Sequence, residues 1–115
     1  VRARAAIVLD GPGDLGAERD AFDALCQFSS VAPFMGGTSR ERFEAIAPRP
    51  ELAEVLFVQA KLPAPPPASL ELVAGGGATI SVRENPGASH FAIITPADPA
   101  YVTNEPAMLD VLKAR

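Results

Sequence analysis

Residues 69–84 read SLELVAGGGATISVRE, two short apolar-rich segments separated by three consecutive glycines. In the second segment Ile80 and Val82 alternate with polar residues, which is typical of a half-buried strand. Leu70 and Leu72 alternate in the same way in the first segment, and the glycines supply the positive φ angles that a tight hairpin needs. The stretch therefore predicts two antiparallel strands.

The same pattern continues after the hairpin. Residues 85–87 (Asn-Pro-Gly) are a turn signal, and residues 91–94 (Phe-Ala-Ile-Ile) form an apolar run of the kind found in central strands. We therefore expect residues 69–95 to fold as a three-stranded antiparallel meander.

The N-terminal half is expected to contribute one strand and two helices. The apolar run at residues 5–9 ends at Asp-Gly-Pro-Gly and predicts a strand, whereas residues 14–28 have the apolar spacing of an amphipathic helix. A second helix is expected over residues 39–47, where Thr38 and Glu41 fit a capping box. Two alternatives stay open for residues 51–62: a helix by spacing, or a buried strand, which we favour because strands follow.

The last helix is expected to be capped by Asn104, with Pro106 in its first turn. These elements predict a single α+β domain spanning residues 1–115. Its sheet would be mostly antiparallel, formed by the C-terminal three-stranded meander and the N-terminal strand, with the helices packed on one face.

Composition excludes several functional classes. The 115 residues are 48% hydrophobic and 21% charged, as in a globular domain, and the formal net charge is −4. Nucleic acids and anionic membrane surfaces are poor partners for an acidic chain without a basic stripe. No apolar run approaches the roughly 18 residues that span a bilayer. A single cysteine, Cys26, forbids an intrachain disulfide, and we expect a cytoplasmic protein.

The strongest candidate for ligand binding is the predicted helix start at Gly36–Arg42. Free backbone amides, two small hydroxyl residues and two arginines favour a phosphate or carboxylate group there. The anion-binding candidates are Thr38, Ser39, Arg40 and Arg42. The alternative interpretation is an ordinary capped helix with solvated arginines.

His90 is the only histidine and the only catalytic candidate, although the sequence reveals neither a nucleophile nor an orienting acid for it. Asp10 and Asp14 lie four residues apart without a third ligand, so we predict turn and capping roles for them and no metal site. Residues 11–16 (GPGDLG) match a dinucleotide-binding pattern, but Pro12 lacks an amide hydrogen and Asp14 would repel phosphate. We therefore expect no cofactor.

Dispersed charges and the lack of a coherent catalytic group favour a small non-catalytic module for binding or assembly. The apolar residues of the last helix would contact a protein partner or another copy of the chain; these are Met108, Leu109, Val111 and Leu112. The alternative is a small enzyme or sensor domain that binds an anionic small molecule at Gly36–Arg42.

Overall fold

A computed structural model describes residues 3–45, 52–75 and 77–113. Its three strands form one sheet in the order β1 (Ala5–Leu9), β2 (Glu54–Gln59), β3 (Thr79–Glu84), and all of them run parallel. Ile7 lies opposite Leu56, which in turn lies opposite Ser81. Parallel neighbours need a long crossover between them, and helices occupy both crossovers here.

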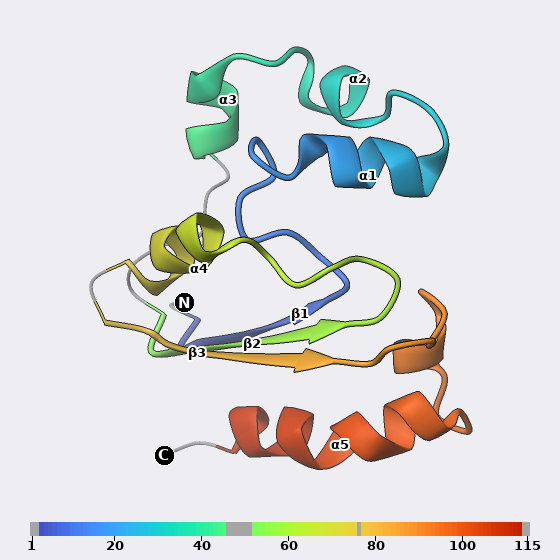
Figure 1. Ribbon diagram of the computed structural model, residues 1–115. Helices are drawn as coiled ribbons and strands as arrows, with labels where there is room; N and C mark the ends of the chain where they lie inside the picture. Colours follow the sequence, from blue (N-terminus) through green and yellow to red (C-terminus); the bar gives the residue numbers. More distant parts are fainter. Residues whose placement is uncertain (1–2, 46–51, 76, 114–115) are drawn as a thin grey trace.

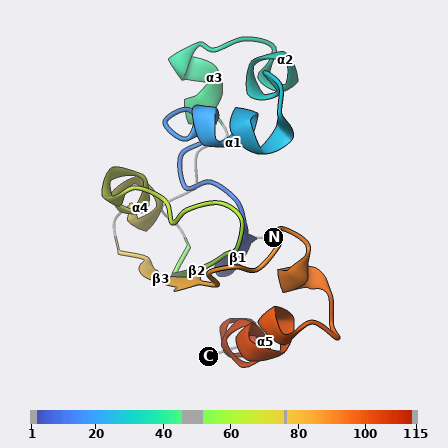
Figure 2. The same cartoon turned by 45° about the vertical axis from the view of Figure 1, so that its right-hand side comes forward.

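The helices lie in layers on both sides of the sheet (Figure 1). Between β1 and β2 come α1 (Arg19–Cys26), α2 (Val31–Met35) and α3 (Arg40–Ala45), and between β2 and β3 comes α4 (Pro67–Ala74). After β3 follow the short 3-10 helix η1 (Ala92–Ile94) and α5 (Pro99–Leu112). Figure 2 shows α4 and α5 on opposite faces of the sheet, with α1–α3 stacked beyond α4.

The core has two halves that meet at the central strand. On one face of β2, Leu56 and Val58 pack with Ile93 and with Met108 of α5. On the other face, Val55 and Phe57 pack with Val73 of α4. A parallel strand covered on both faces needs an unbroken apolar run, and residues 55–58 (Val-Leu-Phe-Val) provide one.

The predicted antiparallel meander is wrong. Residues 69–74 belong to α4 and residues 92–94 to η1, so only residues 79–84 of the meander form a strand. Ser69 and Val73, four residues apart, are buried, while Leu72 is 44% exposed. A spacing of four residues between buried side chains is typical of a helix, whereas the alternation of Leu70 and Leu72 had indicated a strand. Gly75, at φ 54°, follows the last residue of α4, so it ends a helix instead of turning a hairpin.

The other element predictions have mixed outcomes. Strands at residues 5–9 and 79–84 are confirmed, and residues 51–62 contain a strand and no helix among those described. The first helix is shorter than expected, and the predicted end of the second, at residues 46–47, lies outside the described residues. The last helix begins at Pro99, where the Asp98 carboxylate accepts a hydrogen bond from the amide of Ala100. Asn104 is therefore a buried residue within α5 and not its cap.

The chain does combine helices with a sheet, but the sheet is parallel and covered on both faces. Within the described ranges, no helix has the length and apolarity needed to cross a bilayer.

Candidate functional site

The site is built around the side chain of Asp10, which directly follows β1. Its carboxylate is fully buried and accepts hydrogen bonds, each 3.0 Å long, from the backbone amides of Ala60, Lys61 and Leu62. These three residues follow β2 directly. Asp10 itself has a φ of 50°, a left-handed conformation that aspartate tolerates better than most residues.

His90 contacts the same carboxylate. Its Nδ1 atom lies 2.6 Å from Oδ2 of Asp10, and the histidine side chain is 38% exposed. An ionised carboxylate can only accept, so Nδ1 carries the proton and donates it. In the neutral ring this leaves Nε2 with a lone pair, which is the form of a histidine that can act as a general base.

Two opposing effects act on the pKa of Asp10. Burial raises this pKa, because a low-dielectric surrounding disfavours the charged form. The hydrogen bonds from the amide of Ala60, the ring of His90 and the amides of Leu62 and Lys61 favour the charged form, and together they hold the pKa of Asp10 below its usual value. The carboxylate is therefore ionised at neutral pH.

The parallel sheet explains why residues so far apart in the chain meet. The carboxyl ends of all its strands lie at one edge, which is where parallel sheets usually carry their functional groups. Asp10 follows β1, residues 60–62 follow β2, and the segment with His90 follows β3. Asn85 starts that last segment, and both its backbone amide and its Nδ2 donate to the carbonyl oxygen of Gln59 at 2.9 Å.

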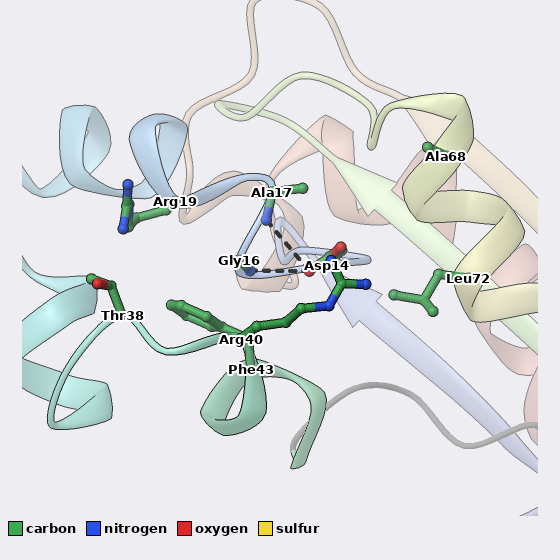
Figure 3. A pocket seen from close by; sticks show the side chains of 9 residues that line it. All are labelled: Asp14, Gly16, Ala17, Arg19, Thr38, Arg40, Phe43, Ala68 and Leu72. Carbon is green, nitrogen blue, oxygen red and sulfur yellow. Dashed lines mark hydrogen bonds between the residues drawn. The ribbon is translucent and has the colours of Figure 1, made fainter.

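Thr38 and Arg40, two of the anion-binding candidates, lie at a cavity of about 510 Å³ between the α1–α3 layer and α4. Arg40 extends from α3 toward Asp14, and Leu72 of α4 lies across the cavity (Figure 3). The cavity is lined by Asp14, Gly16, Ala17, Arg19, Thr38, Arg40, Phe43, Ala68 and Leu72.

Ser39 and Arg42, the other two candidates, make local contacts. The hydroxyl of Ser39 accepts from the backbone amide of Arg42 at 3.4 Å, so Ser39, and not Thr38, has the capping position of α3. The Arg42 guanidinium donates to the carbonyl oxygen of Met35 at 3.1 Å and packs beside Gly36. The structure thus brings two of the four candidates to the cavity.

Three backbone amides of the glycine-rich loop at residues 11–16 already donate hydrogen bonds to carboxylates of the chain. Glu18 accepts from the amides of Gly13 and Asp14 at 2.8 and 2.7 Å, and Asp14 accepts from the amide of Gly16 at 3.1 Å. Carboxylates of the chain thus occupy the donors that a pyrophosphate group would need.

The apolar residues of α5 divide between the core and the surface. Met108 is buried against the sheet and Val111 is half-buried, whereas Leu109 and Leu112 are 49% and 70% exposed. Assembly through this helix therefore stays a prediction.

Sequence reasoning missed the partner of His90. Asp10 was visible as an acid that follows an apolar strand, but only parallel strands place the ends of β1 and β3 at the same edge. Among the residues that the structure describes, no group of three or more His, Cys, Asp or Glu side chains is arranged to hold a metal ion. No protein-family model, curated protein or solved structure matches this chain.

Proposed function

We propose that Asp10 and His90 are the acid–base pair of a hydrolytic site, in which Nε2 of His90 removes a proton from an attacking hydroxyl group or water. The observation that carries the proposal is the 2.6 Å contact between Nδ1 of His90 and the buried carboxylate of Asp10. Such a carboxylate fixes the tautomer and orientation of the ring and stabilises the imidazolium that forms during proton transfer.

The acid precedes the histidine along the chain, an order found both in α/β-hydrolases and in subtilisin. Chymotrypsin-type enzymes have the opposite order, with the histidine before the acid. Asp10 precedes His90 by 80 residues, and both follow strands of a parallel sheet.

The nucleophile is not supplied by the residues directly before Asp10. Residues 1–9 contain only Val, Arg, Ala, Ile and Leu, none of which carries a hydroxyl or thiol group. We therefore assign the base and its orienting acid to His90 and Asp10, and the attacking group to a water molecule or to a hydroxyl group outside residues 1–9.

The hydrolysis of p-nitrophenyl acetate tests the proposal. We expect His90→Gln and Asp10→Asn each to lower the rate about 100-fold or more, the usual loss when a general base is removed. Asp20→Asn, which removes a fully exposed carboxylate, is the matched control and should hydrolyse the ester at the unchanged rate. His90→Gln protein that hydrolyses the ester as fast as the unsubstituted chain would exclude the proposal.

The tautomer of His90 gives a second test that needs no substrate. Because the chain has one histidine, its ring nitrogens give unambiguous ¹⁵N signals. We expect the neutral ring to carry its proton on Nδ1, and we expect Asp10→Asn to abolish that preference. A neutral ring protonated on Nε2 would contradict the proposed role of Asp10.

A second candidate function is the binding of a small anion in the cavity beside Arg40. It is supported by Thr38, Arg19 and Arg40 lining one cavity, although Asp14 lines it as well. Phosphate and citrate should raise the melting temperature of the chain and of Lys61→Gln, an exposed-cation control, but not that of Arg40→Gln. An equal rise in the melting temperatures of Lys61→Gln and Arg40→Gln would show that the anions act by general screening of charge.

A further inference from the structure

The first strand, β1, forms one edge of the sheet. It pairs with β2 on one side, and no strand of the described residues pairs with its other side. The backbone amide of Asp10 donates to the carbonyl oxygen of Val58 in β2 at 2.8 Å, and successive peptide groups along a strand point to alternate sides. The N–H and C=O groups of Ala5, Ile7 and Leu9 therefore point away from β2, toward the open edge.

The β1 edge lacks the features that usually protect an exposed strand. Such edges commonly carry charged residues, prolines or a bulge, whereas residues 5–9 (Ala-Ala-Ile-Val-Leu) contain neither charge nor proline and pair with β2 in an unbroken register. The opposite edge, β3, ends in Arg83 and Glu84. Leu9 is 39% exposed and the rest of β1 is half-buried, while residues 55–58 of β2 are at most 2% exposed. An additional strand would therefore bury apolar surface at β1.

The outward-pointing groups of β1 are arranged symmetrically about Ile7. When a second copy of β1 runs antiparallel with Ile7 opposite Ile7, Ala5 of each copy lies opposite Leu9 of the other. These are the three positions whose peptide groups point outward, so each opposed pair can exchange two hydrogen bonds. A register shifted by one residue would instead oppose outward-pointing groups to groups that already face β2. The strand is thus complementary to an antiparallel copy of itself.

The charges that flank β1 favour the same direction of pairing. Arg4 directly precedes the strand, and the ionised Asp10 directly follows it. In the antiparallel register residue 4 of one copy lies opposite residue 10 of the other, so opposite charges approach at both ends of the contact. A parallel copy would bring like charges together. Asp10 keeps the hydrogen bonds within its own chain, so the attraction selects the direction without adding a bond.

The position of α5 is compatible with this pairing. The helix contacts β1 and β2 to the same extent, so it lies over the space between them. A two-fold axis between the paired Ile7 residues, perpendicular to the sheet, keeps both copies of α5 on the same face. They are then two strand spacings apart, about 10 Å. Helices normally pack at about this distance, so a helix contact accompanies the strand contact.

We infer that two copies of this chain associate through antiparallel β1 strands, in register at Ile7, and form one continuous sheet with three strands from each copy. A symmetric contact of this kind is closed, so association stops at the dimer. One strand pair and one helix pair make a small interface, and we expect a dissociation constant of about 10–100 µM. Dimer formation does not depend on the hydrolytic role proposed for Asp10 and His90.

Sedimentation equilibrium of the full chain tests the inference. The average mass should rise from one chain to two between about 1 µM and about 1 mM. Amide hydrogen exchange followed by NMR then locates the contact. At about 1 mM the outward amides of Ile7 and Leu9 should exchange at least about tenfold more slowly than those of Ile80 and Val82, which point outward at the β3 edge.

Ala5→Pro removes one outward N–H group and no hydrogen bond of the sheet itself. We expect it to raise the dissociation constant about tenfold or more and to abolish the slow exchange of Ile7 and Leu9. Glu84→Pro makes the same change at the β3 edge and is the matched control, which should dimerise like the unsubstituted chain. Urea unfolding checks that both variants fold. Leu9→Lys, a charge added at an exposed position, should weaken the dimer as well and serves if Ala5→Pro does not fold.

A mass of one chain at every concentration up to about 1 mM would overturn the inference. A dimer in which Ile7 and Leu9 exchange as fast as Ile80 and Val82 would place the contact on another surface and would equally refute it. Equal weakening by Ala5→Pro and Glu84→Pro, or an unchanged dissociation constant in the folded β1 variants, would exclude pairing through β1.

Discussion

A single carboxylate joins the three strand ends. Asp10 accepts hydrogen bonds from three consecutive amides after β2 and from His90 after β3, and its side chain is inaccessible to solvent. A buried charge is tolerated only when its acceptor positions are filled in this way. The same bonds that suit Asp10 to the proposed role of orienting acid therefore also hold the sheet edge together.

The lowered pKa of Asp10 predicts a pH-dependent contribution to stability. Because the folded state binds the proton less tightly than the unfolded state, this contribution is present above the unfolded pKa, about 4, and is lost as the pH falls through the folded value. Asp10→Asn should lower the free energy of unfolding by about 1–3 kcal/mol at neutral pH, with a smaller difference below about pH 4. Urea unfolding at a series of pH values measures this, and a difference that is constant with pH would contradict it.

The glycines of the 11–16 loop are needed for close approach. None of the three has a positive φ, but a Cβ atom on Gly13 would lie 3.2 Å from Cβ of Ser69 and 3.3 Å from Cγ2 of Val73, both in α4. A Cβ on Gly16 would press on the ring of Phe43 instead, at 3.1 Å. The motif thus packs a loop against a helix.

Gly13→Ala should destabilise the chain by about 1–3 kcal/mol, because the added methyl group meets Ser69 and Val73, the buried residues by which α4 packs on the sheet. Gly16→Ala is the comparison from the same motif and should cost less, since Phe43 lies in the loosely packed α3 and can move. Urea midpoints of the two variants give the test. A larger loss for Gly16→Ala would show that the α1–α3 layer is more tightly held than we infer.

At the scale of elements, α5 is attached to β3 by a polar cluster. Oδ1 of Asn104 accepts from Nε of Arg83 at 2.9 Å, and its Nδ2 donates to Oδ1 of Asn85 at 2.5 Å and to the carbonyl oxygen of Ala100 at 2.6 Å. Asn104 is 1% exposed, whereas Asn85 is half-buried and Arg83 is exposed. Through Asn85 the cluster reaches the segment that carries His90.

Asn104→Ala should lower the free energy of unfolding by about 1–3 kcal/mol, because the half-buried Asn85 and the exposed Arg83 lose their hydrogen-bond partner. Thr103→Ala, at the exposed neighbouring position, should change it by no more than about 0.5 kcal/mol. Chemical denaturation of both variants is the measurement. Equal effects would mean that helix propensity, and not the polar cluster, governs this part of α5.

At the scale of the whole molecule, packing is uneven between the layers. The sheet with α4, η1 and α5 contains nearly all of the buried apolar residues described, whereas α1 buries none and α2 buries only Val31. Phe28 and Phe34, on the loop after α1 and on α2, are 66% and 84% exposed. Helices with so little buried surface open at low free-energy cost.

Native-state hydrogen exchange should therefore show the amides of α1 and α2 exchanging much faster than those of β2 and α5. The expected order follows from the buried apolar contacts that each element loses when it opens. Mass spectrometry of peptides covering each element provides the measurement. Uniform protection across the chain would refute the layered stability.

Much of the local structure was predictable from particular residues. The apolar runs at residues 5–9 and 55–58 and the alternation of Ile80 and Val82 identified all three strands of the sheet. The strand predicted at residues 69–74 was wrong because a six-residue segment with two leucines fits both the strand period and the helix period. His90 was a candidate only because it is the single histidine of the chain. Its contact with Asp10 could not be predicted from the sequence.

The sequence by itself thus determined where the strands form and where most of the helices form. Side chains return to the same face every two residues along a strand and every 3.6 residues along a helix, so the order of apolar and polar residues carries that information. Only the tertiary structure decided that the strands run parallel. The direction of β3 relative to β2 depends on whether the segment between them contains an antiparallel strand or the crossover helix α4. The direction of β3 in turn determines the end of the sheet at which the following segment emerges. That is why the contact between Asp10 and His90, on which the proposed function depends, belongs to the fold and not to any local pattern.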